Sequence, residues 1–158
     1  MATEYSFITK WKTTAPIEDA WDAIRLSLEW PGWWPCFEKV TEKSPGDVNS
    51  IGSIRQYTLK SPTGYRITFD LTLTDHVEHK LLAGTSSGEL EGTGNWLFEV
   101  KNGVVYIDYL WKVRTQKTWM NAFAFILKPA FVWNHRIVMK NGARFLAKKL
   151  GHPVNDIT

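Results

Sequence analysis

Hydrophobic and polar residues alternate along most of the chain in short runs that end at turn residues. The first run, Tyr5–Lys12, places Tyr5, Phe7, Thr9 and Trp11 on one side and lysines on the other, which predicts a half-buried strand. Six further strands are predicted over Phe37–Lys43, Ile51–Lys60, Tyr65–Thr74, Lys80–Ser86, Leu90–Val100 and Val104–Thr115. Because strands that alternate cleanly and are linked by hairpins pair with one another, we expect an antiparallel sheet with one wet face and one apolar face.

A short helical region is predicted between the first two strands. Apolar residues recur there at the spacing of an amphipathic helix that begins after Pro16 and ends before Pro31, and they are Ile17, Ala20, Trp21, Ile24 and Leu28. The segment Trp30–Pro35 contains two prolines and a glycine, which interrupt a regular helix. We therefore expect a turn or a one-turn helix in this segment, which places its tryptophans against the body of the domain.

A second helical region lies at the C-terminal end. Helical periodicity returns at Trp119, and Pro129 predicts a break or kink. Residues 130–150 then read as a long helix, closed by Gly151 and Pro153. This order of elements predicts a single α+β domain over residues 1–158, in which a curved sheet wraps around the last helix.

Composition narrows the class of protein. Of the 158 residues, 44% are hydrophobic and 22% are charged, and the net charge of +3 gives no case for nucleic-acid binding. No apolar run approaches the roughly 18 residues of a membrane-spanning helix, and the first residues do not have the pattern of a secretory signal. A single cysteine, Cys36, permits neither an internal disulfide nor a cysteine-based zinc site. We therefore expect a cytoplasmic protein without an integral membrane segment.

Aromatic residues make up 14% of the chain and include nine tryptophans. Two glycines, Gly92 and Gly94, share the inward face of the Leu90–Val100 strand with Trp96 and Phe98. Either these glycines serve a bulge that bends the strand, or they leave space for a cavity beside the sheet, and a bend and a cavity can coexist.

The buried side of the last helix carries a polar residue and a glycine. Its apolar residues include Phe131, Val138 and Met139, with His135 near the middle of that face. Gly142 shares the face, although glycine costs helix stability. Two interpretations remain open: His135 is a polar handle beside free space, or it is a core histidine bonded to a backbone carbonyl or to Tyr109.

Several motifs lie in a characteristic order along nearly the whole chain. They are Ala15-Pro16 with Ala20-Trp21, the Trp-Pro-rich Trp30–Pro35, Gly88–Trp96, Tyr109–Val113, and Trp133-Asn134-His135 followed by Met139 and Gly142. In this order they resemble the START-related (SRPBCC) superfamily, in its polyketide cyclase/dehydrase and lipid-transport branch. The resemblance implies a helix-grip fold: a seven-stranded curved antiparallel sheet around a long C-terminal helix, with two short helices after the first strand and a hydrophobic cavity between sheet and helix.

The resemblance also implies a function in that cavity. Members of the superfamily bind lipids, sterols, polyketides, quinones or plant hormones, and some catalyse cyclisation, aromatisation or dehydration. We predict that the chain binds a hydrophobic small molecule (a lipid, a polyketide-like aromatic or an isoprenoid). The expected lining residues are Phe7, Trp11, Phe69, Leu71, Gly92, Gly94, Trp96, Phe98, Trp111, Phe131, Val138, Met139 and Gly142.

The alternative function is a polyketide cyclase, aromatase or dehydratase that uses the same cavity. His135 would act as acid or base, and Tyr109 would orient a carbonyl. The other polar residues considered for the interior are Tyr65, Tyr57, Gln56 and Arg55. A third possibility is a protein-interaction module built on an exposed Trp33-Trp34 region.

No cofactor and no metal are expected. Asp75-His76 and Glu78-His79 bring potential metal ligands together, but they lie at a predicted strand-to-strand turn, where polar groups are simply solvated. The expected partner is the small-molecule ligand, and the protein is expected to be a monomer or a homodimer.

Overall fold

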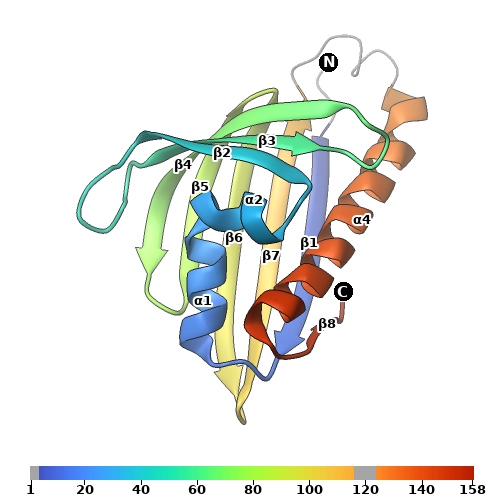
Figure 1. Ribbon diagram of the computed structural model, residues 1–158. Coiled ribbons are helices and arrows are strands. Elements are labelled where there is room, and N and C mark those ends of the chain that lie inside the picture. The colour runs from blue at the N-terminus through green and yellow to red at the C-terminus, as the bar shows by residue number, and fades with distance from the viewer. Residues whose placement is uncertain (1–3, 116–123) are drawn as a thin grey trace.

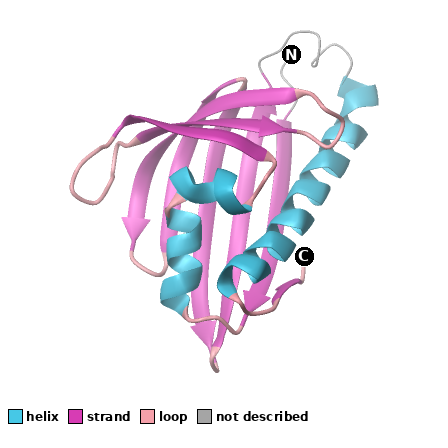
Figure 2. Cartoon of the chain, in the orientation of Figure 1, coloured by secondary structure: helices cyan, strands magenta, loops and turns pink. Residues whose placement is uncertain are grey.

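The computed structural model describes residues 4–115 and 124–158, with side chains of the last helix described from Lys128 onward. The elements are β1 (Glu4–Thr13), α1 (Ile17–Arg25), the 3₁₀ helix η1 (Ser27–Glu29), α2 (Trp30–Trp33), β2 (Phe37–Ser44), β3 (Ile54–Lys60), β4 (Arg66–Val77), β5 (Leu81–Gly88), β6 (Leu90–Lys101), β7 (Val104–Thr115), α4 (Ala124–Leu150) and β8 (Val154–Asp156). The helices lie on one side of a single curved sheet (Figures 1 and 2).

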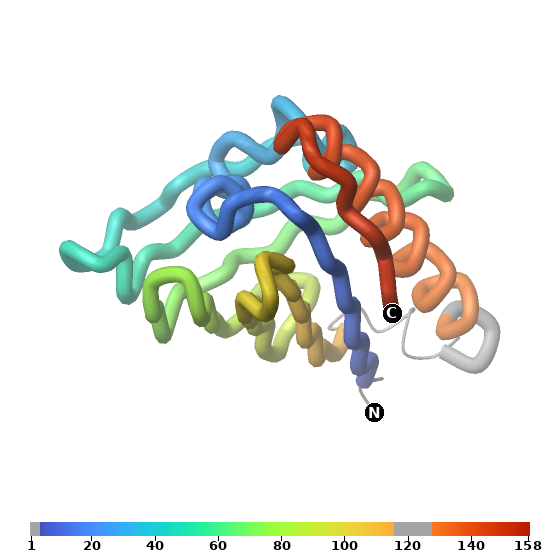
Figure 3. The backbone as a smooth tube through the Cα atoms, turned by 90° about the horizontal axis from the view of Figure 1, so that it is seen from below, coloured from blue at the N-terminus to red at the C-terminus, as the bar shows by residue number. Residues whose placement is uncertain are grey.

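The sheet is antiparallel and has the strand order β2-β3-β4-β5-β6-β7-β1-β8. The seven strands predicted from alternation are all present. An eighth, β8, was not predicted because three residues after Pro153 are too short to show a period. It pairs with β1 and brings the C-terminal end of the chain beside the first strand (Figure 3).

The helices differ from the prediction in two places. The first helix ends at Arg25, and Leu28, expected on the buried face, is 41% exposed because the chain turns into η1 after Leu26. Of the break or kink expected near Pro129, the break is wrong, because α4 continues through this proline, and the kink stays a prediction. Proline has no backbone N–H, so the helix lacks the hydrogen bond that this position would otherwise donate. The predicted start at Trp119 lies outside the described residues.

Trp34 fills the space beside α4 that the sequence suggested was free. A Cβ atom at Gly142 would overlap Cζ2 of the Trp34 indole. The indole is only 1% exposed, and its ring lies 4.8 Å from Phe37, 5.2 Å from Trp30 and 6.2 Å from Trp11, measured between ring centroids. Gly142 therefore makes room for the tryptophan that directly follows α2, and the hollow part of the interior lies elsewhere.

The glycines of β6 also allow neighbouring atoms to approach the strand closely. Gly92 has φ +153°, and a Cβ there would overlap the backbone of Lys112 on β7. At Gly94 a Cβ would lie 2.9 Å from the ring of Trp111, so the glycine lets that ring fold over the sheet. The β6–β7 pairing runs without a register shift, so the glycines do not serve a bulge between these two strands.

We predict that Gly142→Ala destabilises the fold. Helix propensity alone would stabilise α4 by about 1 kcal/mol. Because the added Cβ would overlap a ring that is enclosed by other rings, we expect an overpacking cost of about 3 kcal/mol, so the free energy of unfolding should fall by about 2 kcal/mol in urea titrations. Gly32→Ala is the matched control, because nothing lies within 4 Å of a Cβ at that exposed α2 position. Equal or increased stability of Gly142→Ala would show that the Trp34 ring does not pack against Gly142.

Candidate functional site

Two neighbouring compartments lie between the inner face of the sheet and the helices. The first has a volume of about 110 Å³ and is bounded by the α1–α2 region and strands β3–β7. The second, of about 80 Å³, lies against α4. Phe37, Phe69, Tyr109 and Trp111 contribute to the walls of both. The interior is therefore divided by aromatic rings rather than filled by them.

The strand register explains why rings form one wall of the first compartment. Trp96 of β6 pairs with Tyr109 of β7, and their rings stack at 4.1 Å with an interplanar angle of 19°. Gly94 pairs with Trp111, whose ring continues the row 5.8 Å from that of Tyr109. The three rings form an aromatic wall, and another aromatic ring can pack against such a wall in an offset-stacked or edge-to-face arrangement.

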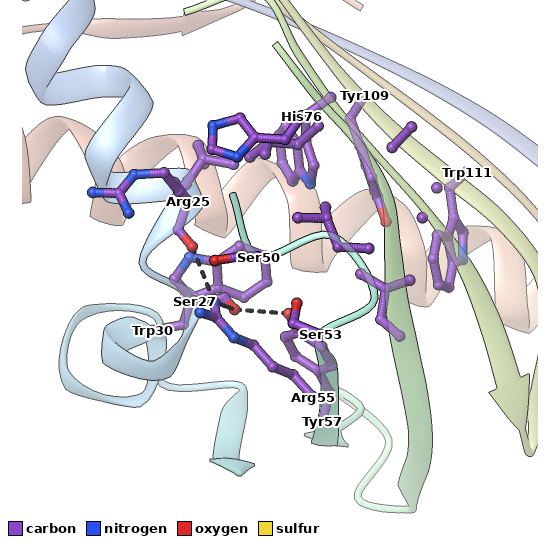
Figure 4. A pocket seen from close by; sticks show the side chains of 18 of the residues that line it. Arg25, Ser27, Trp30, Ser50, Ser53, Arg55, Tyr57, His76, Tyr109 and Trp111 are labelled. Atoms are coloured by element: carbon purple, nitrogen blue, oxygen red, sulfur yellow. Dashed lines mark hydrogen bonds between the residues drawn. The ribbon is translucent and has the colours of Figure 1, made fainter. Parts of the chain in front are cut away.

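The opposite wall of the first compartment is polar and is built around Arg55 on β3 (Figure 4). Its Nη1 donates to the backbone carbonyl of Arg25 at 3.1 Å and to Oγ of Ser27 at 2.8 Å. The Ser27 hydroxyl also lies 2.7 Å from the Tyr57 hydroxyl. Because Ser27 opens η1, these bonds tie the connection between α1 and α2 to the sheet.

The second compartment receives His135 and Asn134 from α4. The imidazole stacks on Phe7 with centroids 3.9 Å apart, and its Nε2 atom is buried without a hydrogen-bond partner among the described residues. Neither of the bonds considered for a core histidine, to Tyr109 or to a backbone carbonyl, is formed within the described residues. Asn134 is 4% exposed, and its Nδ2 donates to the Tyr65 hydroxyl at 3.0 Å.

Burial sets the protonation states of the two candidate catalytic residues. Burial lowers the pKa of His135 to about 4, so its imidazole is neutral at pH 7, with one N–H donor and one nitrogen that is a weak base. The pKa of Tyr109 is raised well above its usual value, first by burial and then by the neighbouring Tyr57. Its phenol therefore stays protonated and can donate a hydrogen bond.

The residues predicted to line the cavity fall into two groups. Those on the compartment walls are Phe69, Leu71, Gly94, Trp96, Tyr109, Trp111, Phe131, His135, Val138 and Met139. The other five lie elsewhere: Phe7 stacks on His135, Trp11 packs against Trp34 and Trp96, Phe98 packs against Trp21, Gly92 lies on the β7 backbone and Gly142 lies under Trp34. Contact of any of these residues with a ligand stays a prediction.

Sequence reasoning missed His76, Ser27, Ser53 and Asn134 as wall residues. His76 was placed at a solvated turn, but it lies within β4, 5.6 Å from the Trp21 ring, with Nδ1 2.7 Å from the Asn49 carbonyl oxygen. A register shift after Leu73 makes this position unpredictable from simple alternation. Within the described residues, no group of three or more His, Cys, Asp or Glu side chains is arranged to hold a metal ion.

Two further observations concern the thiol of Cys36 and the character of the helices. Burial raises the pKa of Cys36 to about 12, so its thiol is not a nucleophile near neutral pH. No helix in the described ranges, 4–115 and 124–158, combines the length and apolar character that crossing a membrane requires.

Comparisons with known proteins identify the fold. No protein-family model matches the chain, and no curated protein matches it in sequence. The structure resembles the di-domain ARO/CYC StfQ from the steffimycin biosynthetic pathway, with a TM-score of 0.67 and 14% identity over 94% of this chain and 52% of StfQ. The chain thus spans about half the length of that di-domain protein.

Two single-domain-sized structures align over nearly their whole length. The Zhui aromatase/cyclase from Streptomyces sp. R1128 has a TM-score of 0.65 and 13% identity, with 93% of this chain and 94% of that one covered. Ara h 8.0201 has a TM-score of 0.61 and 13% identity, with coverage of 94% and 97%. These likenesses confirm the helix-grip fold that the resemblance to the START-related superfamily implied.

We predict that His135 makes the stability depend on pH. The unfolded chain takes up this proton near pH 6.5 and the folded chain only near pH 4, so the unfolded state binds more protons between these values. The free energy of unfolding should therefore decrease as the pH falls from 6.5 towards 4, and His135→Gln should remove part of that decrease. His152→Gln, near the C-terminus, is the control. An identical pH dependence in wild type and His135→Gln, or an imidazole NMR titration near 6.5, would contradict the buried neutral ring.

Proposed function

We propose that the protein binds a flat, apolar small molecule noncovalently in the two compartments, with a polyketide-like aromatic fitting better than a lipid or an isoprenoid. The observation that carries the proposal is the row of stacked rings formed by Trp96, Tyr109 and Trp111, which faces unfilled space. Aromatic rings in offset-stacked or edge-to-face contact gain energy beyond the burial of area.

The size of the compartments limits the ligand. An engineered apolar cavity of about 150 Å³ holds one benzene molecule. The compartments measure about 110 and 80 Å³, so each alone is smaller than that cavity, and only the two together exceed it. A ligand of two or more rings would span both and contact the shared residues Phe69, Tyr109 and Trp111.

The expected affinity is moderate. Burying about 300 Å² of apolar ligand surface contributes on the order of 7 kcal/mol at 25 cal/mol per Å². The loss of translational and rotational freedom removes several kcal/mol of this, which leaves roughly micromolar binding or weaker unless polar groups add to it. Such an affinity suits a carrier or a sensor that releases its ligand.

An enzyme is the second candidate, because His135 and Tyr109 face the same second compartment. A neutral imidazole could remove a proton while the phenol donates a hydrogen bond to a carbonyl oxygen. StfQ and Zhui carry the name aromatase/cyclase, so the fold accommodates that chemistry, although a shared fold does not transfer a function. The low basicity of the His135 imidazole, set by burial, favours binding over catalysis.

Filling the compartments should abolish binding. We predict that Leu71→Trp in the first compartment and Val138→Phe in the second each weaken binding of 2-naphthol at least about tenfold, which is about 1.4 kcal/mol. Isothermal titration calorimetry gives the affinity, and circular dichroism verifies folding. Leu97→Trp, at an exposed position on β6, is the matched control and should bind like wild type.

Native mass spectrometry of protein purified without detergent completes this test. A bound small molecule whose mass and chromatographic retention are both unchanged after incubation with the protein supports binding, whereas a change in either supports the enzyme. Absence of any co-purified molecule, together with no heat of binding for 2-naphthol, would contradict the proposal.

A further inference from the structure

We infer that the outward face of α4 binds the surface of an anionic phospholipid bilayer. This face is a line of exposed residues: Trp133, Arg136, Lys140, Arg144 and Lys148. Successive members are three or four residues apart, so they follow one side of the helix. The buried residues of α4 pack against the rest of the molecule, so this outer line faces away from it, at the edge that α4 forms in Figures 1 and 3.

Charge is distributed unevenly along the chain, and its positive part includes α4. Residues 109–155 contain nine lysine or arginine residues and no aspartate or glutamate, although the net charge of the whole chain is only +3. Exposed charges that are farther apart than the Debye length, about 8 Å at physiological ionic strength, are largely screened from one another. The acidic residues elsewhere in the chain therefore do not cancel the positive field in front of α4.

The cations of the outer line have no carboxylate partners. Elsewhere exposed cations are paired, as Lys43 is with Asp70 at 2.7 Å, whereas none of the ion pairs within the described residues includes a side chain of α4. Acidic residues approach the helix at its C-terminal end, where Asp19 and Asp22 line a surface hollow together with Lys149. Lys149 is therefore not part of the outer line, and the remaining cations are free to face an external anion.

An exposed aromatic residue stands at the N-terminal end of the outer line. The Trp133 side chain is 51% exposed, and it shares a shallow surface hollow with Lys128, Pro129, Val132 and Arg136. Tryptophan is enriched at membrane–water interfaces, because its ring is largely apolar while its N–H is polar. The ring and its apolar neighbours are thus placed beside cations on the same face.

An anionic bilayer matches both features of this face. Its headgroup layer is negative, and an apolar layer begins directly beneath it, so cations and an indole side by side have complementary partners there. A nucleic-acid duplex presents phosphates on its outside without an apolar layer behind them, so it would match the cations alone. The bilayer is therefore the occupant that the composition of the outer line favours.

Sedimentation with sucrose-loaded vesicles tests this inference. Phosphatidylcholine vesicles that contain about 30% phosphatidylserine should bind the wild type at about 0.1 M salt, and pure phosphatidylcholine vesicles should bind it at least about tenfold more weakly. Raising the salt to about 0.5 M should remove most of this difference, because it shortens the Debye length.

A pair of double variants separates the outer line from total charge. Lys140→Gln/Arg144→Gln should weaken binding to the anionic vesicles about 30-fold, because each cation near such a surface contributes about fivefold. Lys43→Gln/Lys101→Gln is the matched control, because it lowers the net charge equally at exposed residues of the sheet that have carboxylate partners. This control should bind like wild type.

A second pair of variants tests the aromatic end of the outer line. Trp133→Ser should weaken binding to the anionic vesicles about tenfold, because the ring no longer enters the interface. Ile8→Ser removes an apolar side chain that is 56% exposed on β1, and it should have no effect. Circular dichroism verifies that all of these variants fold.

Equal binding to the two kinds of vesicle, or an equal loss in the two double variants, would overturn the inference. Binding of a short DNA duplex that Lys140→Gln/Arg144→Gln abolishes, without binding to vesicles, would assign the face to nucleic acid and overturn it as well. No residue of the outer line contributes to the compartment walls. Binding of 2-naphthol should therefore be the same in every variant, and failure of vesicle binding leaves the proposed function standing.

Discussion

The packing of the Trp34 indole against Gly142 is the contact on which the arrangement of the interior depends. The indole of Trp34, which directly follows α2, lies against the backbone of α4 at Gly142, where there is no side chain. It also packs with Trp11, Trp30 and Phe37. This cluster closes the part of the molecule near α2. The rings of β6 and β7 stack across the strand pair, from Trp96 to Tyr109, and along β7, from Tyr109 to Trp111, and the two compartments lie between this wall and the helices.

The hollow has two chemically different ends because of which elements reach it. The connection between α1 and α2 brings a hydroxyl and a carbonyl that hold Arg55, and α4 brings an imidazole whose burial keeps it neutral. A charged donor thus stands at one end and a neutral ring with an unpaired buried nitrogen at the other. Buried polar groups without partners are uncommon in native proteins, and such groups mark where a ligand or a bound water supplies the missing partner.

Much of this architecture could be predicted from the sequence, because alternation and helical spacing report directly which face of an element is buried. The inward set on β7, Val105, Ile107, Tyr109, Trp111 and Val113, is the set that the pattern predicts. Periodicity does not report what occupies the gap opposite a glycine. The glycine at position 142 led us to expect free space, but Trp34, which is distant in sequence, lies against it.

The positions of His76 and Arg55 at the cavity wall could not be predicted from the sequence for similar reasons. His76 reaches the cavity wall because a register shift follows Leu73, and a single irregular residue changes the face of everything after it. Arg55 was one of several polar residues considered for the interior. Its guanidinium is fixed at the cavity wall by the hydrogen bonds that it donates to the Ser27 hydroxyl and the Arg25 carbonyl. These two acceptors lie in a different part of the chain, so the sequence pattern around Arg55 does not report them.

The central claim is that the space between the sheet and α4 is partly empty and lined by rings. Crystals of the protein equilibrated under xenon pressure test it most directly, since xenon enters empty apolar cavities. The account predicts xenon density beside Phe69, Tyr109 and Trp111, within the two compartments. An interior without xenon, with side chains occupying both compartments, would contradict it.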